Sequence, residues 1–164
     1  MQVPVEIAKL AQEVVAALKA RNLTIATAES CTGGMLAALL TDIEGCGHGF
    51  DRGFVTYSKE AKSELLGISH GLLDQNDAVS EAVARAMAEG ALDRSRAQIA
   101  IAVTGFAGPA GPGQEEGLAH FALARRDRPT AHREEHFGAL GRGVIRVKSL
   151  KIMLDMVEES LEQA

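Results

Sequence analysis

Three side chains that can attack a carbonyl or bind a substrate stand in a row in the segment AESCTGG, residues 28–34. A serine or cysteine becomes a nucleophile when a neighbouring base activates it. The simpler interpretation is that Ser30 and Thr32 cap a helix, which stabilises it by about 1 kcal/mol per cap. A cap needs no glycines, however, and each glycine costs a helix about 1 kcal/mol. The segment therefore leaves two roles open, a helix start and a nucleophile.

The nucleophile interpretation depends on a base. The five histidines are poorly placed for this role: two fall in expected loops and three alternate within expected strands. Lys62 follows the strand-like segment RGFVTYS by about one helical turn, so its side chain can point back toward the strand ends near Ser30. Burial near Tyr57 would lower the pKa of Lys62 toward that of a general base. A solvated lysine on an amphipathic helix is the alternative. Cys31 is the weaker nucleophile, because a lone cysteine is more often a small core residue.

Further candidate groups are less specific. Residues 104–109, TGFAGP, form a second glycine loop whose N–H groups can surround an anion. Arg142 and Arg146 are four residues apart, so both can reach one anion from a helix. The acidic residues and histidine between positions 42 and 51 fit no known ligand spacing, so we expect no metal. The usual nucleotide-binding motifs do not occur in the sequence.

The elements that must position these residues alternate along the chain. Helical spacing of apolar residues predicts helices over residues 5–20, 31–43, 59–67, 79–93 and about 142–162, with Ser80 as an N-cap. Short apolar or β-branched runs predict strands over residues 24–29, 52–58, 98–105, 117–124 and 131–137. Residues 68–77 are expected to form a loop. The pattern indicates an α/β sandwich, with helices on both faces of a mixed five-stranded sheet.

Composition limits the class of protein. The 164 residues fit one domain, and a net charge of -5 with a pI near 5.5 argues against a nucleic acid or an acidic membrane as the partner. Two cysteines are too few for a disulfide framework, and no leader is evident, so we expect a cytoplasmic protein. No apolar run approaches the roughly 18 residues of a membrane span.

Four motifs occur in one order: AESCTGG, RGFVTYSKEAK, AVSEAV and VTGFAGP. Together they resemble the CinA C-terminal domain family from about residue 6 to the end of the chain. This resemblance implies one amidase domain over residues 1–164, folded as a three-layer α/β/α sandwich with a mixed five-stranded sheet. It also implies hydrolysis of nicotinamide mononucleotide to nicotinate mononucleotide and ammonia, without a cofactor.

The resemblance also implies roles for matching residues. Ser30 would be the nucleophile, Lys62 its base and Tyr57 a hydrogen-bonding partner at the reacting centre. Substrate binding would fall to Thr32, Gly33, Gly34, Thr104, Gly105, Gly108, Arg142 and Arg146. Of these, the N–H groups of residues 32–34 would hold an oxyanion, the glycine loop would contact the ring or ribose, and the arginines would hold the phosphate.

Two departures from the family pattern leave alternatives open. Asp77 stands where the family usually has glycine, and the loop at residues 110–117 is shorter than usual. An amidase for a related carboxamide therefore remains an alternative, as does a non-catalytic nucleotide- or partner-binding protein linked to competence or DNA damage. A second apolar face on the last helix, formed by Ile152, Met153 and Met156, indicates a homodimer.

Overall fold

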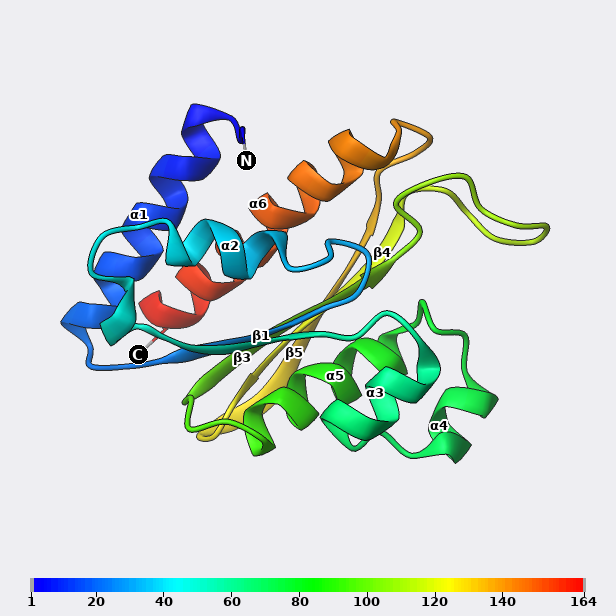
Figure 1. Cartoon of the computed structure of the whole chain (residues 1–164), viewed down its shortest axis with the longest axis horizontal. Helices are drawn as coiled ribbons and strands as arrows, with labels where there is room; N and C mark the ends of the chain where they lie inside the picture. Colours follow the sequence, from blue (N-terminus) through cyan, green and yellow to red (C-terminus); the bar gives the residue numbers. More distant parts are fainter. Residues whose placement is uncertain (1, 164) are drawn as a thin grey trace.

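Five strands form one mixed sheet with helices on both faces in the computed structural model, which describes residues 2–163 (Figure 1). The strands are β1 (Ile25–Glu29), β2 (Phe50–Val55), β3 (Ile99–Gly105), β4 (Leu118–Arg125) and β5 (Arg128–His136). They lie in the order β2-β1-β3-β4-β5. β1 is parallel to β2 and to β3, whereas β4 and β5 run antiparallel to their neighbours. The expected three-layer α/β/α sandwich is confirmed.

The helices divide between the two faces of the sheet (Figure 1). One face is covered by α1 (Val5–Ala20), α2 (Met35–Thr41) and α6 (Arg142–Glu162), and the other by α3 (Lys59–Leu66), α4 (His70–Gln75) and α5 (Glu81–Asp93). A short 3₁₀ turn, η1 (Cys46–His48), precedes β2. The core on the α1 and α6 side is built from large aliphatic side chains.

The sheet presents small residues to α5. Alanines of three neighbouring strands form this face: Ala26, Ala28, Ala100, Ala102, Ala122 and Ala124. Such small side chains let a helix approach the backbone of the sheet closely, and all six are at most 1% exposed. We call this set the alanine face. It forms the floor on which α5 packs.

Most expected elements are found, with differences at their ends. The expected helices over residues 5–20 and 142–162 and the N-cap at Ser80 are confirmed. The helix expected from residue 31 instead begins at Met35, because Gly34 has a φ of 93°, which a right-handed helix cannot contain. The segment expected as a loop contains α4, whose N-cap Ser69 accepts from the Leu72 N–H.

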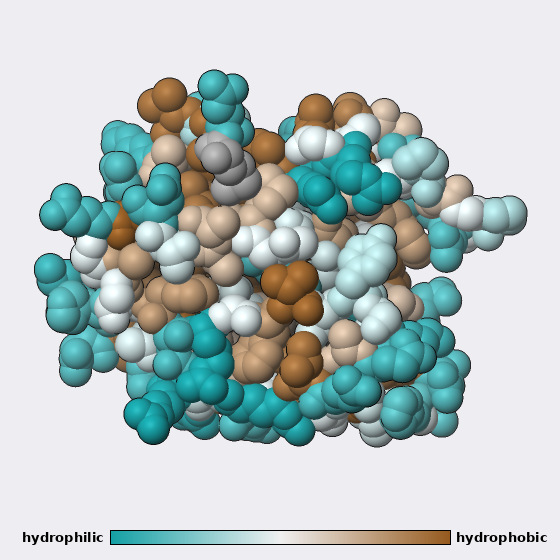
Figure 2. Space-filling view, viewed as in Figure 1, coloured by the Kyte–Doolittle hydropathy of each residue, from teal (hydrophilic) through white to brown (hydrophobic). Residues whose placement is uncertain are grey.

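The apolar face of the last helix that was expected to form a dimer is buried within its own chain. Met153 and Met156 are 0% and 5% exposed and pack within the core of their own chain, while Ile152 is partly buried beside them. This face of α6 contacts α1 and is not free for a second subunit. Figure 2 shows hydrophobic residues near the middle of one face of the molecule and at its upper edge, and hydrophilic residues along the lower edge and the sides. Over residues 2–163, no helix is long and apolar enough to cross a membrane.

Candidate active site

The carboxyl ends of three parallel strands bring the candidate motifs together. Glu29 at the end of β1 pairs with Val55 in β2 and with Val103 in β3. The segments that follow these strands therefore start at one edge of the sheet, the usual place for ligands in open α/β sheets. Ser30 follows β1 directly, and the loop at residues 106–117 follows β3, at the right of Figure 1.

Lys62 lies against Ser30. Its Nζ is 3.2 Å from the Ser30 Oγ, and its side chain is 1% exposed although lysines are almost never fully buried. The start of α3 sets this position, because Ser58 caps the helix by accepting from the Ala61 N–H at 3.0 Å. Lys62 then falls one turn into the helix and points back toward β1. The sequence left open whether Lys62 could reach Ser30, and the geometry shows that it does.

The surroundings of Lys62 favour a neutral amine. Burial lowers the pKa of its ammonium group below the ordinary lysine value. The Nζ donates to the main-chain oxygens of Thr56 and Tyr57 at 3.0 Å and 3.1 Å. A neutral amine has two N–H groups and one lone pair. With both N–H groups donated to these carbonyls, the lone pair is left facing the Ser30 hydroxyl.

Ser30 and Thr32 do not cap α2, so the capping interpretation is wrong. The N-cap of α2 is Gly34, and the buried carboxylate of Glu29 accepts from the first N–H groups of the helix, those of Leu36 at 3.1 Å and Ala37 at 2.9 Å. The Thr32 hydroxyl also donates to Glu29. A carboxylate at a helix N-terminus is a stronger acceptor than a neutral hydroxyl, which explains the outcome.

Glu29 is the residue of the candidate site that the sequence motifs did not single out. It is 0% exposed and immediately precedes Ser30, so its three hydrogen bonds hold the turn that carries the serine. One signal was present in the sequence: a single charged residue ends an otherwise uncharged strand.

Arg146 supports the same turn from the other side. Its Nε donates to the main-chain oxygen of Cys31 at 2.7 Å, which ties α6 to the residue after Ser30. Burial raises the pKa of the Cys31 thiol to about 11, so this thiol stays protonated at neutral pH and is a poor nucleophile.

The main-chain N–H groups of the turn differ in their availability. That of Gly33 donates to the Ser30 oxygen at 3.1 Å and is already used. Within residues 2–163, those of Cys31, Thr32 and Gly34 have no hydrogen-bond partner, so of the three expected oxyanion donors only Gly33 is already used. They are the donors that a developing negative charge beside Ser30 would find first.

The other expected substrate residues fall into two groups. The Thr104 hydroxyl donates to the Ala78 oxygen at 2.6 Å and is buried, and Gly105 packs closely on Ala119. These two residues shape the floor of the site. Gly108 lies under the exposed guanidinium of Arg142, where an added Cβ would be 2.5 Å from a nitrogen of that side chain. The loop and the start of α6 thus meet at an exposed arginine.

Tyr57 lies at the mouth of the site. It contacts Lys62 through its main-chain oxygen, while its side chain is 72% exposed. The expectation that the Tyr57 ring helps to bury Lys62 is therefore wrong. Burial of Lys62 comes from the end of the sheet and from α3 itself.

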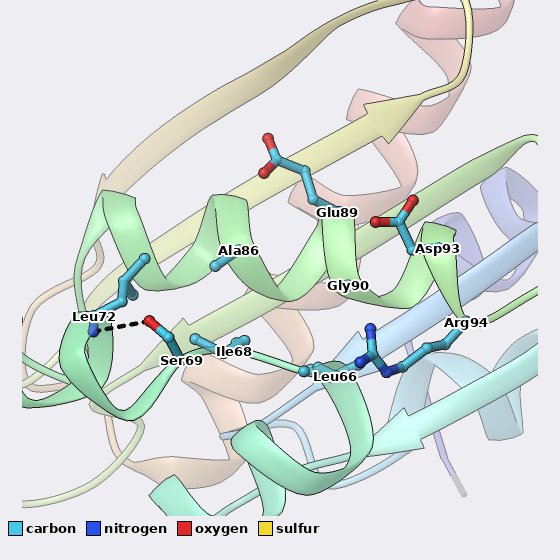
Figure 3. Close-up of a pocket in the computed structure, with 10 residues that line it drawn as sticks. Leu66, Ile68, Ser69, Leu72, Ala86, Glu89, Gly90, Asp93 and Arg94 are labelled. Atoms are coloured by element: carbon cyan, nitrogen blue, oxygen red, sulfur yellow. Dashed lines mark hydrogen bonds between the residues drawn. The ribbon is translucent and has the colours of Figure 1, made fainter.

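A separate hollow lies between α3, α4 and α5 (Figure 3). Its volume is about 320 Å³, and Arg94 extends along it beside Leu66. The Ser69 hydroxyl in this hollow accepts from the Leu72 N–H and is already used (Figure 3). Its lining includes neither Ser30 nor Lys62.

Across the part of the chain that the structure describes, no group of three or more acidic, cysteine or histidine side chains is arranged to hold a metal.

Comparisons with known proteins point to one family. The sequence model of the CinA C-terminal domain matches residues 7–161. A putative competence-damage inducible protein of Symbiobacterium thermophilum is 54% identical over 121 residues, which are 73% of this chain but 28% of that protein. The nicotinamide-nucleotide amidohydrolase PncC of Escherichia coli K12 is 49% identical over 121 residues, 73% of each chain.

Solved structures agree with these matches. The competence/damage inducible protein CihA of Agrobacterium tumefaciens superposes with a TM-score of 0.94 at 41% identity, over 99% of both chains. A CinA superfamily protein of Escherichia coli gives a TM-score of 0.88 at 34% identity, over 96% of this chain and 92% of the other.

Proposed function

We propose, since this chain belongs to the CinA C-terminal domain family, that it hydrolyses the carboxamide of nicotinamide mononucleotide to nicotinate mononucleotide and ammonia. The observation that carries the proposal is the contact between the buried Lys62 Nζ and the Ser30 Oγ at 3.2 Å. A serine amidohydrolase requires a base beside its nucleophile, and a desolvated amine can serve as one, whereas a binding module has no need of this contact. The name of the Escherichia coli relative, a nicotinamide-nucleotide amidohydrolase, supports the choice of substrate.

The proposed reaction has two stages. In the first, the Lys62 amine accepts the Ser30 proton as the oxygen attacks the carboxamide carbon, and the carbonyl oxygen becomes an oxyanion near the N–H groups of Cys31 and Thr32. The intermediate collapses when the C–N bond breaks and Lys62 returns the proton to the departing ammonia. In the second, water attacks the ester on Ser30, gives its proton to Lys62, and the acid is released as the Ser30 oxygen takes that proton back.

The charged parts of the substrate have partners in this arrangement. We assign its phosphate to Arg142, which is exposed above Gly108, and to the guanidinium nitrogens of Arg146 that do not bond Cys31. The reaction needs no metal in this scheme. Both cysteines are free thiols, which agrees with a cytoplasmic setting.

Ammonia release from nicotinamide mononucleotide tests the proposal. The protein is compared with Ser30→Ala and Lys62→Met, and Lys59→Met serves as the matched control because Lys59 lies in the same helix with an exposed side chain. We expect turnover by the unaltered protein and by Lys59→Met, and a loss of roughly 10³-fold or more in the other two. Equal turnover by Ser30→Ala would refute the mechanism. Nucleotide binding without any turnover would favour a non-catalytic binding protein instead.

A further inference from the structure

Tyr57 combines exposure with closeness to the reacting pair. Its side chain is 72% exposed, yet its main-chain oxygen is 3.1 Å from the Lys62 Nζ. Val55, two residues earlier on β2, is also exposed, at 51%, and touches the position of Gly34 in the Ser30 turn. The exposed Val55 side chain thus borders the turn that carries Ser30, and the exposed Tyr57 ring belongs to the residue whose main-chain oxygen contacts Lys62.

The position of Tyr57 argues against a role in proton transfer. The amine of Lys62 is satisfied by main-chain oxygens and by Ser30, and the tyrosine contributes only its carbonyl to that set. Its ring extends toward solvent instead. An exposed aromatic ring beside a reacting centre offers a substrate its π face, which attracts a cation within about 6 Å.

We propose that Tyr57 is a specificity-determining residue that binds the cationic pyridinium ring of the substrate through its aromatic face. The proposal rests on the function proposed above and narrows the substrate class to carboxamides on a quaternised, positively charged ring. In such a nucleotide the ring nitrogen carries a positive charge because it is bonded to ribose. Free nicotinamide has a neutral ring and gains less from the same contact.

The charges around the site are compatible with this assignment. Burial lowers the pKa of Lys62 and so favours the neutral amine over a second cation beside the ring. A bound cation would disfavour the ammonium form of Lys62 further and keep the base active. The exposed cation Arg142 lies at the start of α6 beside Gly108 and is the group that we assign to the phosphate rather than to the ring. A substrate with a positive ring and a negative phosphate matches Tyr57 at one end of the site and Arg142 at the other.

Kinetics of two variants separate an aromatic role from a hydroxyl role. Tyr57→Phe keeps the ring, and Tyr57→Leu keeps apolar bulk without the π face. We expect Tyr57→Phe to keep the KM for nicotinamide mononucleotide within about twofold, and Tyr57→Leu to raise it roughly 3- to 30-fold with little change in kcat. A loss of kcat shared by both variants would overturn the proposal and assign the phenol hydroxyl to the chemistry.

Fluorescence gives a readout that does not depend on turnover. Tyr57 is the only tyrosine of a chain that has no tryptophan, so tyrosine emission reports on this ring alone. We expect 1-methylnicotinamide, a cationic ring without ribose or phosphate, to quench the emission saturably, and neutral nicotinamide at equal concentration to do so far less. N-acetyltyrosinamide in solution corrects for collisional quenching.

The two proposals can fail separately. Equal quenching by the cationic and neutral rings, or quenching that never saturates, overturns the role of Tyr57 even if ammonia is released. Saturable quenching by the cation in a protein that releases no ammonia supports the role of Tyr57 and refutes the amidase.

Discussion

The side chains of Glu29 and Ser30, neighbours in sequence, leave β1 on opposite faces of the sheet. Glu29 accepts hydrogen bonds from the start of α2, and Ser30 meets Lys62 of α3 on the other face. This follows from the alternation of side chains along a strand. The Glu29 carboxylate therefore stabilises the turn on one face of the sheet, and the Ser30 hydroxyl contacts the Lys62 amine on the other. Only one peptide bond separates Glu29 from Ser30.

Glu29→Gln should destabilise the fold. The amide has one acceptor oxygen, and its NH₂ group would face N–H donors of α2, so at least one buried hydrogen bond is lost. We expect the free energy of unfolding to fall by about 1–3 kcal/mol in urea denaturation. Glu44→Gln, at an exposed position after α2, is the control and should change little. Equal stability of both variants would show that the carboxylate is not needed at this helix start.

The pH dependence of activity should report on Lys62. Its neutral form is the proposed base, so kcat/KM should rise with pH and level off above the pKa of Lys62. Burial lowers that pKa, so the plateau should begin below the ordinary lysine value of about 10.4. A rate that falls as the pH rises through this range would contradict a lysine base.

The same lysine should make stability depend on pH. Between the lowered pKa in the folded state and the ordinary pKa in the unfolded state, the unfolded chain binds a proton that the folded chain does not. The free energy of unfolding then rises with pH, by up to about 1.4 kcal/mol per pH unit, and falls as the pH is lowered through the window. The difference in stability between the protein and Lys62→Met, followed by urea denaturation, should show this slope.

Gly90→Ala should weaken both the fold and the site. A methyl group at Gly90 in α5 would overlap the carbonyl oxygen of Leu66, the last residue of α3. We expect a loss of about 1–3 kcal/mol in thermal or urea unfolding, and a fall in kcat because α3 carries Lys62. Gly71→Ala in α4 is the matched control. Nothing lies within 4 Å of its added Cβ, so helix propensity should make it neutral or stabilising by up to about 1 kcal/mol.

Two arginines on α6 should behave differently when truncated. Arg142 is exposed above Gly108, so Arg142→Ala should raise the KM for the nucleotide by roughly tenfold and leave the melting temperature unchanged. Arg146 donates to the Cys31 oxygen, so Arg146→Ala should lower the melting temperature and kcat as well. Identical effects of the two substitutions on KM, kcat and melting temperature would contradict this division.

The long elements could be predicted because their patterns repeat over many residues. α1 and α6 have 16 and 21 residues, enough for an apolar stripe to recur several times. α4 has 6 residues, too few for a period to show, and a polar sequence surrounds it. The parallel order of β1, β2 and β3 then brings together motifs that lie far apart in sequence.

The side-chain roles were harder to predict because they depend on competition between groups. Ser30 has the side chain of a good cap, but the Glu29 carboxylate, which comes from the end of the strand, takes the donors of α2 first. Tyr57 is five residues from Lys62 in sequence and contacts it, yet it does so through its main-chain oxygen while its ring faces solvent. Residue type alone does not tell whether the main chain or the side chain of a residue is used.

The alanine face fixes the register of β1, and with it the position of Ser30 beside Lys62, as well as supporting α5. A slip of β1 by one residue would turn Ile25 and Thr27 toward α5 and bring the Glu29 carboxylate to the position where Ser30 meets Lys62. A carboxylate beside Lys62 would favour its ammonium form, and the proposed base would be lost. Larger side chains do not fit between β1 and α5, so this register is excluded sterically. The exclusion acts at the packing of β1 on α5, away from Glu29 and Lys62 themselves.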